Sequence, residues 1–574
     1  MADMKNPALL KPFPRKFVAP DFVVKDADSI KPWVDKLLER PLSSAEDLTR
    51  WLEDVSELDG IVGEDSNVRH VAMTCDTKDA AKTEAYLYFV REIAPRLAEW
   101  DDKIRRKYYD SPYRKGLDPR IFGRLDRMFA TAIELFVEKN IPLDVKLSEM
   151  SQEYQKITGA WTVEFDGKTR TMPQMSRYLQ QTDEKLRESA WRAMTQRRLA
   201  DAPALEALFD RMLKTRHEYA LNLGLKEYRE YSFKAKLRDY SPDDCIEFHD
   251  SIEKAVVPLM RRIMEKRRKQ MALEKLRPWD LSVDPLGRPP LEPFKDVEKL
   301  QGGVGEIFQK IDPRLGEMFG AITGTMDLDS RDGKAPGGYQ TTFEERRVPF
   351  IFTNAAGVQG DVTTLLHEGG HAFHTIQCRD AKMIWYRHAS MEFSEVASMT
   401  QELFGNPHAG VFYADGGDVR RAMFEQLERV VDLFPWVATV DAFQHWIYTN
   451  PGHTGDERAK KWLEISGRFE AGLDWDGLDP DVRKYAWHRQ LHIFEVPFYY
   501  VEYAIAQLGA LQLYRQYKGN PKRAVDAYLS ALKLGGSLSP KHLFESAGIK
   551  FDFSIGMLSE LMAMVEEELE TLEF

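Results

Sequence analysis

The chain is 574 residues long, with 43% hydrophobic and 11% aromatic residues, a composition that excludes a disordered or fibrous protein. Its formal net charge is −12 with 30% charged residues, and this acidity argues against general nucleic-acid or membrane binding. A chain of this length exceeds what one hydrophobic core usually serves, so we expect at least two lobes.

Cysteine usage and the first residues indicate the cellular compartment. The three cysteines, Cys75, Cys245 and Cys378, include no C-x-x-C pair. The start of the chain has no apolar core of signal-peptide length, and no run of about 18 apolar residues occurs. The sequence therefore predicts a cytoplasmic protein without a disulfide framework or a membrane-spanning helix.

The first part of the chain has a helical pattern. Apolar residues recur at spacings of three and four from Asp28 to about Ile141, and Ser43 and Ser44 indicate a helix start. Around residue 160 the pattern changes to alternation, and Asp166-Gly167 supplies a hairpin turn. We therefore expect an N-terminal helical lobe over residues 1–200, with a short β-hairpin near 160–172, and a second domain over residues 201–574.

The middle of the chain returns to helical periodicity. It predicts helices from Met175 to Leu223, ending at Gly224, from Pro242 to Leu276, and from Val297 to Ile311. A basic run at residues 261–269 is interrupted by Glu265, so a solvated helix face is a better interpretation than a nucleic-acid patch. The proline-rich residues 278–293 indicate a connection.

Residues 326–329 and 347–353, separated by the loop at 331–338, predict a small sheet. Pro349 cannot donate a ladder hydrogen bond, so its strand is expected at an edge. An extended peptide could pair with such an edge, or the edge could only pack against its neighbour, and the sequence leaves both interpretations open.

The sequence Leu365-Leu366-His367-Glu368-Gly369-Gly370-His371-Ala372-Phe373-His374 contains the H-E-x-x-H pattern of zinc hydrolases. On a helix, the imidazoles of His367 and His371 leave one face a turn apart and can reach one metal ion. The carboxylate of Glu368 can then take a proton from water as a general base. Asp361 is a plausible N-cap, and the glycine pair suggests that another backbone or the substrate passes close.

A catalytic zinc site usually has a third protein ligand. The extended H-E-x-x-H-x-x-G-x-x-H pattern fails, because His374 stands where it requires glycine and Gln377 where it requires histidine. The probable helix from Met391 to Leu403 offers Glu392, Glu395 and Glu402 on one side. His374 is a competing ligand, but three ligands from one straight helix cannot surround an ion, so a packing or supporting role is favoured.

The sequence HEGGHAFH, followed by EVASMTQE with Glu395 twenty-four residues after His371, resembles the thimet oligopeptidase and oligoendopeptidase F family of gluzincin metallopeptidases. This resemblance implies one zinc ion held by His367, His371 and Glu395, with Glu368 as general base. Around these residues, Glu392, Glu402 and His374 are expected in supporting positions.

Two further segments carry the resemblance. DLDSRDGKAPGGYQTTF and VPFIFTNAAG resemble the family's glycine-tyrosine loop and edge strand, and WHRQLHIFEVPFYYVEYAIAQLGALQ resembles its substrate-binding segment. The last segment implies that His492 and Tyr503 bond the scissile carbonyl oxygen, with Tyr499 or Tyr500 nearby. The first two imply substrate-binding residues, namely Gly337, Gly338, Tyr339, Phe352, Thr353, Asn354 and Ala355.

The resemblance implies a mainly α-helical, two-lobed fold around a deep channel, with a small β-sheet beside the zinc helix. The implied function is zinc-dependent hydrolysis of internal bonds in short unstructured oligopeptides. The alternatives are a peptidyl-dipeptidase or carboxypeptidase, for which no terminus-binding Arg or Lys can be assigned, and a catalytically silent scaffold, against which the intact motif argues. The sequence does not predict the oligomeric state.

Overall fold

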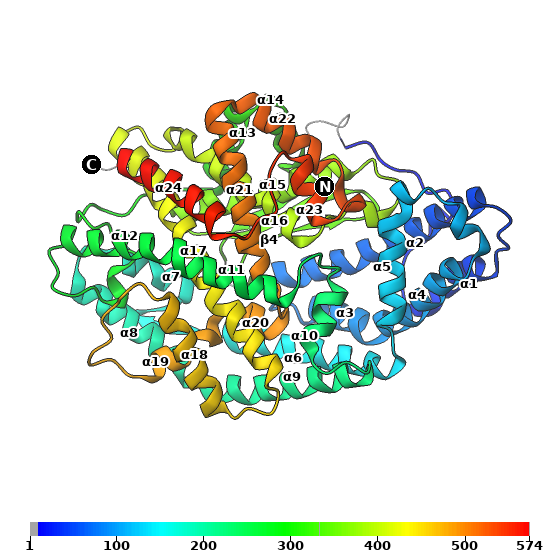
Figure 1. The fold of residues 1–574 in the computed structure, drawn as a ribbon, viewed down its shortest axis with the longest axis horizontal. Coiled ribbons are helices and arrows are strands. Elements are labelled where there is room, and N and C mark those ends of the chain that lie inside the picture. Colours follow the sequence, from blue (N-terminus) through cyan, green and yellow to red (C-terminus); the bar gives the residue numbers. More distant parts are fainter. Residues whose placement is uncertain (1–9, 332, 573–574) are drawn as a thin grey trace.

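The computed structural model describes residues 10–331 and 333–572, and it is mainly helical with two small β-sheets. Of the first six helices, α1, α2, α4 and α5 lie at one end of the molecule, and α3 and α6 lie nearer its middle (Figure 1). Their bounds are α1 Ala27–Glu39, α2 Ala45–Cys75, α3 Ala80–Tyr88, α4 Ala94–Tyr109, α5 Pro119–Glu134 and α6 Ile141–Gly159. The predicted start of α2 is confirmed, because the side chain of Ser44 accepts a hydrogen bond from the backbone N–H of Asp47.

Helices α1 to α5 have a hydrophobic core of their own. Its buried side chains run from Val18 to Phe129, together with Met383 from a later loop, and Trp51 at its centre is fully buried. Helix α6 instead contributes Met150 and Tyr154 to the larger core formed by the rest of the chain. These are the two largest of the four clusters of buried hydrophobic residues in the described part of the chain.

The predicted β-hairpin is confirmed. Strands β1 Thr162–Phe165 and β2 Lys168–Thr171 pair antiparallel, with Phe165 opposite Lys168. Asp166 and Gly167 between them have φ angles of 52° and 69°. Positive φ at both turn residues is the type I′ geometry that matches the twist of two paired strands, which explains why the sequence uses Asp-Gly here.

Two stretches predicted as continuous helices are divided. The first contains α7 Met172–Ser176, α8 Glu184–Ala200 and α9 Ala202–Asn222, and the second contains α11 Pro242–Ala255 and α12 Val257–Gln270, with α10 Tyr228–Ala235 between the two stretches. Pro203 and Pro258 each lie in the first turn of a new helix, where the missing N–H is not needed. The basic run is only partly a solvated face, because Arg267 turns inward and pairs with Glu428.

The three-stranded sheet corrects the prediction made for Pro349. Its strands are β3 Met326–Asp329, β4 Tyr339–Phe343 and β5 Val348–Ala355, in the order β3-β5-β4, so the strand with Pro349 is central. Strand β3 pairs with β5 only from Ile351 onward, so at Pro349 the single neighbour is β4 and a missing N–H is tolerated. The outer strand against the metal-motif helix is therefore β4.

The centre of the molecule is a stack of helices that includes α15 and α16 (Figure 1). This part contains α13 Val297–Ile311, α14 Pro313–Ile322, α15 Gln359–Cys378 and α16 Met391–Gly405. A Cβ added to Gly370 would lie 2.4 Å from the carbonyl oxygen of Ala397 in α16, and one added to Gly369 would lie 2.5 Å from the Phe308 ring. The expected close approach is confirmed, and at Gly370 the approaching group is the backbone of α16.

Asp361 is not the N-cap of α15, since that helix begins two residues earlier at Gln359. Its carboxylate instead accepts hydrogen bonds from the backbone N–H groups of Ala356, Gly357 and Val358, at 2.8, 2.8 and 3.0 Å. Asp361 therefore fixes the turn that leads from β5 into the metal-motif helix.

The remaining helices surround this centre. They are α17 Gly416–Thr449, α18 Gly455–Phe469, α19 Asp481–Lys484, α20 Leu491–Glu495, α21 Val501–Gly519, α22 Pro521–Leu532, α23 Pro540–Ser546 and α24 Ile555–Thr571. Helix α21 lies along α16 and carries the tyrosine segment to the metal motif (Figure 1). Across the described residues, we find no helix with the length and apolar character needed to span a bilayer.

Candidate metal centre and active site

Helices α15 and α16 bring together His367, His371 and Glu395. Their candidate ligand atoms all lie within 4.8 Å of one another. The Nε2 atoms of His367 and His371 are 3.3 and 3.7 Å from Oε2 of Glu395. Two imidazoles and one carboxylate around a common point form the ligand set that a catalytic zinc site uses. The close contact at Gly370 brings α16 near enough for Glu395 to reach the histidines.

Both histidines are oriented by groups behind them. Oε1 of Glu402 lies 2.7 Å from Nδ1 of His367, and Gln426 of α17 donates to the other oxygen of Glu402 at 2.8 Å. The His371 ring is hydrogen-bonded to the backbone of Ser394. A carboxylate on Nδ1 directs the lone pair of Nε2 toward the centre, as in other histidine metal sites. No local sequence pattern could have indicated Gln426.

Glu395, the third candidate ligand, is held as a carboxylate anion although it is buried. Glu395 is 2% exposed, and the hydroxyl of Tyr499 donates to its Oε1 at 2.7 Å. Burial raises the pKa of Glu395, but His371, His367 and Tyr499 together outweigh burial and lower that pKa to about 2. Tyr499 therefore supports the third candidate ligand, a contact that the sequence did not predict.

Glu368 lies beside this cluster with a free oxygen. Its side chain is buried, and Oε2 has no hydrogen-bond partner among the described residues. The backbone N–H of Gln340 in β4 bonds the carboxylate, and a Cβ added to Gly338 would lie 3.8 Å from Oε1. Burial, assisted by Glu395, raises the pKa of Glu368 to about 7. A buried carboxylate with one unpartnered oxygen is suited to proton transfer.

His492 lies next to Tyr499, Tyr500 and Tyr503, at the start of α21. The His492 ring is 5.6 Å from the Tyr499 and Tyr503 rings and 4.8 Å from the Tyr500 ring. Gln490 bonds Nδ1 of His492 at 2.6 Å. This contact leaves Nε2 as the ring nitrogen available to another group.

The three tyrosines have different surroundings. Burial raises the pKa of Tyr503 far above its usual value, with a further contribution from the charge of Glu395, so its hydroxyl stays protonated. Tyr500 lies beside Gln490, which accepts a hydrogen bond from Trp436 at 2.9 Å, and burial raises the pKa of Tyr500 to about 12. Tyr499 is the one of the three whose hydroxyl bonds a candidate metal ligand.

Residues 177–563 match the model of peptidase family M3, and residues 17–136 match the model of the peptidase M3 N-terminal domain. The chain belongs to peptidase family M3.

Named relatives of this M3 chain are oligopeptidases. It is 24% identical over 396 residues to group B oligopeptidase PepB of Streptococcus agalactiae, and 24% identical over 344 residues to oligopeptidase PepF of Bacillus subtilis. These alignments cover 64% and 57% of this chain but 63% and 49% of the relatives, less than two thirds of their length. The solved structure of PZ peptidase A with an inhibitor superposes with a TM-score of 0.90 at 26% identity, covering 98% of this chain and 99% of the other.

Most side chains of the sheet that were expected to bind substrate already contact other residues of this M3 chain. Tyr339 stacks on buried Phe352 at 4.8 Å, and its hydroxyl is 2.6 Å from Thr74 of α2. Thr353 is buried and donates to the backbone of β3. The contacts of β4 with the substrate would therefore come from its backbone.

The loop before β4 is anchored from β5. Asn354 donates to the carbonyl oxygens of Ala335 and Gly337, both at 2.8 Å, and the neighbouring Ala355 pairs with Asp329 of β3. Gly337 has a φ of 97°, a conformation that requires glycine. These contacts place Gly338 against Glu368.

Glu392, His374 and Glu402, the three residues expected to support the site, have different contacts. Glu392 accepts a hydrogen bond from Tyr240 at 2.9 Å and is not among the groups that approach the metal histidines. His374 is buried, its Nε2 has no partner among the described residues, and burial lowers its pKa to about 3. Glu402 is thus the one of the three supporting residues whose contact with a metal histidine is direct.

Histidines outside the motif join other polar groups. His249 and His445 lie 2.9 and 3.2 Å from one carboxylate oxygen of buried Asp441, with Cys245 nearby. Arg229 donates toward Nδ1 of His445, and these groups form a buried polar cluster. The sequence spacing gave no sign of this cluster, because Cys245 and Asp441 come from α11 and α17.

Proposed function

We propose that this M3 chain is a zinc-dependent endopeptidase that hydrolyses internal bonds of short, unstructured oligopeptides. The observation that carries the proposal is the unpartnered carboxylate oxygen of Glu368 beside the His367, His371 and Glu395 cluster. A metal ligand set with an adjacent buried base is the arrangement that metal-assisted peptide hydrolysis needs.

The residues present fit one zinc ion. Zinc takes two imidazole nitrogens and a carboxylate readily, and each group here is oriented by a further contact, from Glu402, Ser394 or Tyr499. When bound, the ion supplies a Lewis acid that polarises the substrate carbonyl and acidifies water.

The chain's own residues then have distinct tasks. Glu368 accepts the proton from the attacking water and passes it to the leaving amine. Tyr503 and His492 donate hydrogen bonds to the carbonyl oxygen as it gains negative charge, which stabilises the transition state more than the substrate. Tyr499 holds Glu395, and Tyr500 packs beside His492.

Substrate binding would use the outer edge of β4, where the backbone of Gln340 already meets Glu368. An extended peptide added to this edge would pass directly over the base. A channel between an N-terminal lobe of residues 1–200 and a catalytic domain of residues 201–574 would restrict the substrates to short peptides, as the oligopeptidase names of the relatives suggest.

An internally quenched peptide with both ends blocked tests the reaction. We expect the zinc-loaded wild type to cleave it, Glu368→Gln to keep zinc and lose activity about 10³-fold, and Glu395→Gln to lose zinc. Glu464→Gln, on the exposed side of α18, is the matched control and should behave as wild type.

Three results would contradict this proposal. Cleavage only of peptides with a free terminus would indicate an exopeptidase. Full zinc content in Glu395→Gln would remove Glu395 from the ligand set. A wild type that takes up no zinc would indicate a catalytically silent scaffold.

A further inference from the structure

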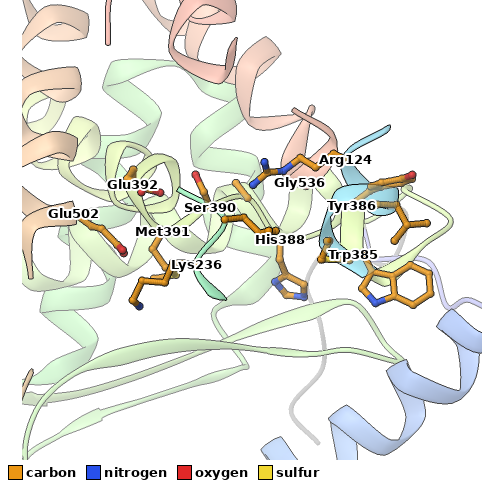
Figure 2. A pocket seen from close by; sticks show the side chains of 14 residues that line it. Arg124, Lys236, Trp385, Tyr386, His388, Ser390, Met391, Glu392, Glu502 and Gly536 are labelled. Atoms are coloured by element: carbon orange, nitrogen blue, oxygen red, sulfur yellow. The ribbon is translucent and has the colours of Figure 1, made fainter. Parts of the chain in front are cut away.

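A cavity of about 200 Å³ lies beside the N-terminal end of α16, the helix that carries Glu395. Its walls come from α5, the turn after α10, the loop before α16, and α21 (Figure 2). The polar residues that matter are Arg124, Lys236, Ser390, Glu392 and Glu502.

Tyr499 contacts both a lining residue of this cavity and a candidate metal ligand. The ammonium of Lys236 is 5.5 Å from the centre of the Tyr499 ring, and the Tyr499 hydroxyl donates to Glu395 at 2.7 Å. A group in the cavity would therefore lie within reach of a peptide whose scissile bond is at Glu368.

The two cations of the cavity have no ion-pair partner within the described part of the chain. Neither Arg124 nor Lys236 has a carboxylate within ion-pair distance, although Arg127 on the same helix pairs with Asp239 at 2.5 Å. Burial lowers the pKa of Arg124 and of Lys236, as expected for cations removed from water without a full counter-charge.

The two carboxylates of the cavity already have donors. Oε1 of Glu502 accepts from the buried guanidinium of Arg238 at 2.6 Å, and Glu392 accepts from the Tyr240 hydroxyl at 2.9 Å. The lining therefore holds two cations and two carboxylates, and the guanidinium of Arg238 on Glu502 adds one positive charge beside them.

One polar atom of the cavity can donate to an anion and has no partner among the described residues: Ser390 Oγ is buried without a hydrogen bond. The Oε2 atom of Glu502, a residue that is 1% exposed, also has no partner there, but a carboxylate oxygen only accepts. Ser390 precedes α16 and does not cap it, so the positive end of this 15-residue helix also opens here. Figure 2 shows Arg124 and Ser390 on one side of the cavity and Lys236 near Glu502 and Met391 on the other.

We propose that this cavity is a substrate subsite for a carboxylate of the bound peptide, held by Lys236 and Arg124 with Ser390 as an additional donor. The inference rests on the proposed peptidase function and adds a charge preference to it. The carboxylate would come from an acidic side chain or from the peptide's C-terminus, and both present the same anion to the two cations.

Paired peptides distinguish the two sources. One set carries Glu or Gln at successive positions on each side of the cleaved bond, with both ends blocked, and the other set has a free or amidated C-terminus. We expect kcat/KM to be about tenfold higher for the carboxylate form at one position or at the terminus, since a charge-assisted contact contributes about that factor.

Substitutions of the two cations test whether the cavity causes the preference for a carboxylate. Lys236→Met and Arg124→Met should each bring the ratio of the paired peptides toward one, and Lys236→Arg should restore it. The matched controls are Lys234→Met on α10 and Arg120→Met on α5, whose charges pair with Glu134 and Asp118 outside the cavity. Zinc content and thermal unfolding establish that each variant is folded.

Binding separates a failure of this inference from a failure of the proposed function. The inactive Glu368→Gln protein, loaded with zinc, is titrated with fluorescent Glu and Gln peptides. Tighter binding of the Glu form, lost in Lys236→Met, supports the subsite even if no peptide is cleaved. Three results would overturn the proposed subsite. The first is equal binding and equal cleavage of the Glu and Gln peptides, and the second is a Glu-to-Gln ratio that is unchanged in both Met variants. The third is a preference for a peptide with Lys over one with Gln.

Discussion

Oε1 of Glu402 lies 2.7 Å from Nδ1 of His367 and thereby connects α16 to the metal-motif helix behind the candidate ligands. This contact fixes the tautomer and the ring orientation of His367, and Gln426 in turn holds Glu402.

Glu402→Ala should therefore weaken zinc binding about 10- to 100-fold without removing any candidate ligand. Competition with a chelator measures the dissociation constant, and Glu464→Gln serves as the exposed control. Unchanged zinc affinity in Glu402→Ala would show that the contact does not support the site.

Gly370→Ala should be destabilising, because the new Cβ would meet the Ala397 carbonyl at 2.4 Å and push α16 away from α15. We expect a loss of about 1–3 kcal/mol in the free energy of unfolding, together with weaker zinc binding as Glu395 retreats. Chemical denaturation of the metal-free protein measures the first effect. Gly467→Ala, at a helix position with open space around it, is the control and should lose no stability.

Replacing each of the three tyrosines by phenylalanine should have a different effect. Tyr503→Phe removes a donor to the developing oxyanion and should lower kcat about 10²- to 10³-fold with zinc retained. Tyr499→Phe should instead weaken zinc binding, because its hydroxyl supports Glu395. Tyr500→Phe should cost less than either. Equal kcat values for Tyr503→Phe and the wild type would exclude Tyr503 from the chemistry.

The loop that carries Gly338 depends on Asp327. Its carboxylate accepts from Arg331 at 2.6 Å and from Lys334 at 2.8 Å, and these contacts outweigh burial and lower the pKa of Asp327. Asp327→Asn should loosen the loop by about 2 kcal/mol, so that hydrogen exchange at residues 335–340 accelerates roughly 30-fold. Exchange in α24, which lies elsewhere, should not change. Protection equal to wild type in the loop would contradict this role.

Stability should depend on pH through Glu495. Burial raises its pKa from 4.5 to about 7, so the folded protein binds this proton more tightly than the unfolded chain. The free energy of unfolding therefore falls as pH rises from 4.5 to 7, by about 1–2 kcal/mol after allowance for partial exposure. Glu495→Gln should remove this loss and exceed the wild type in stability at pH 8 but not at pH 4. Denaturation series at both pH values measure the difference in unfolding free energy between Glu495→Gln and the wild type. An equal difference at pH 4 and pH 8 would falsify the prediction.

The sequence by itself determined the local features. The bounds of α13, the Asp-Gly hairpin and the pairing of His367 with His371 on one face follow from helix periodicity and turn chemistry, which involve residues only a few positions apart. The family resemblance also indicated the tyrosine segment, but without separating Tyr499 from Tyr503.

Only the tertiary structure decided the rest, because it depends on how distant segments pack. Glu392 and Glu395 are three residues apart, yet one meets Tyr240 and the other meets the metal histidines, since α16 lies between α21 and α15. The central position of β5 follows from the parallel pairing of β3, and the cavity at Lys236 is formed by segments that no local pattern connects.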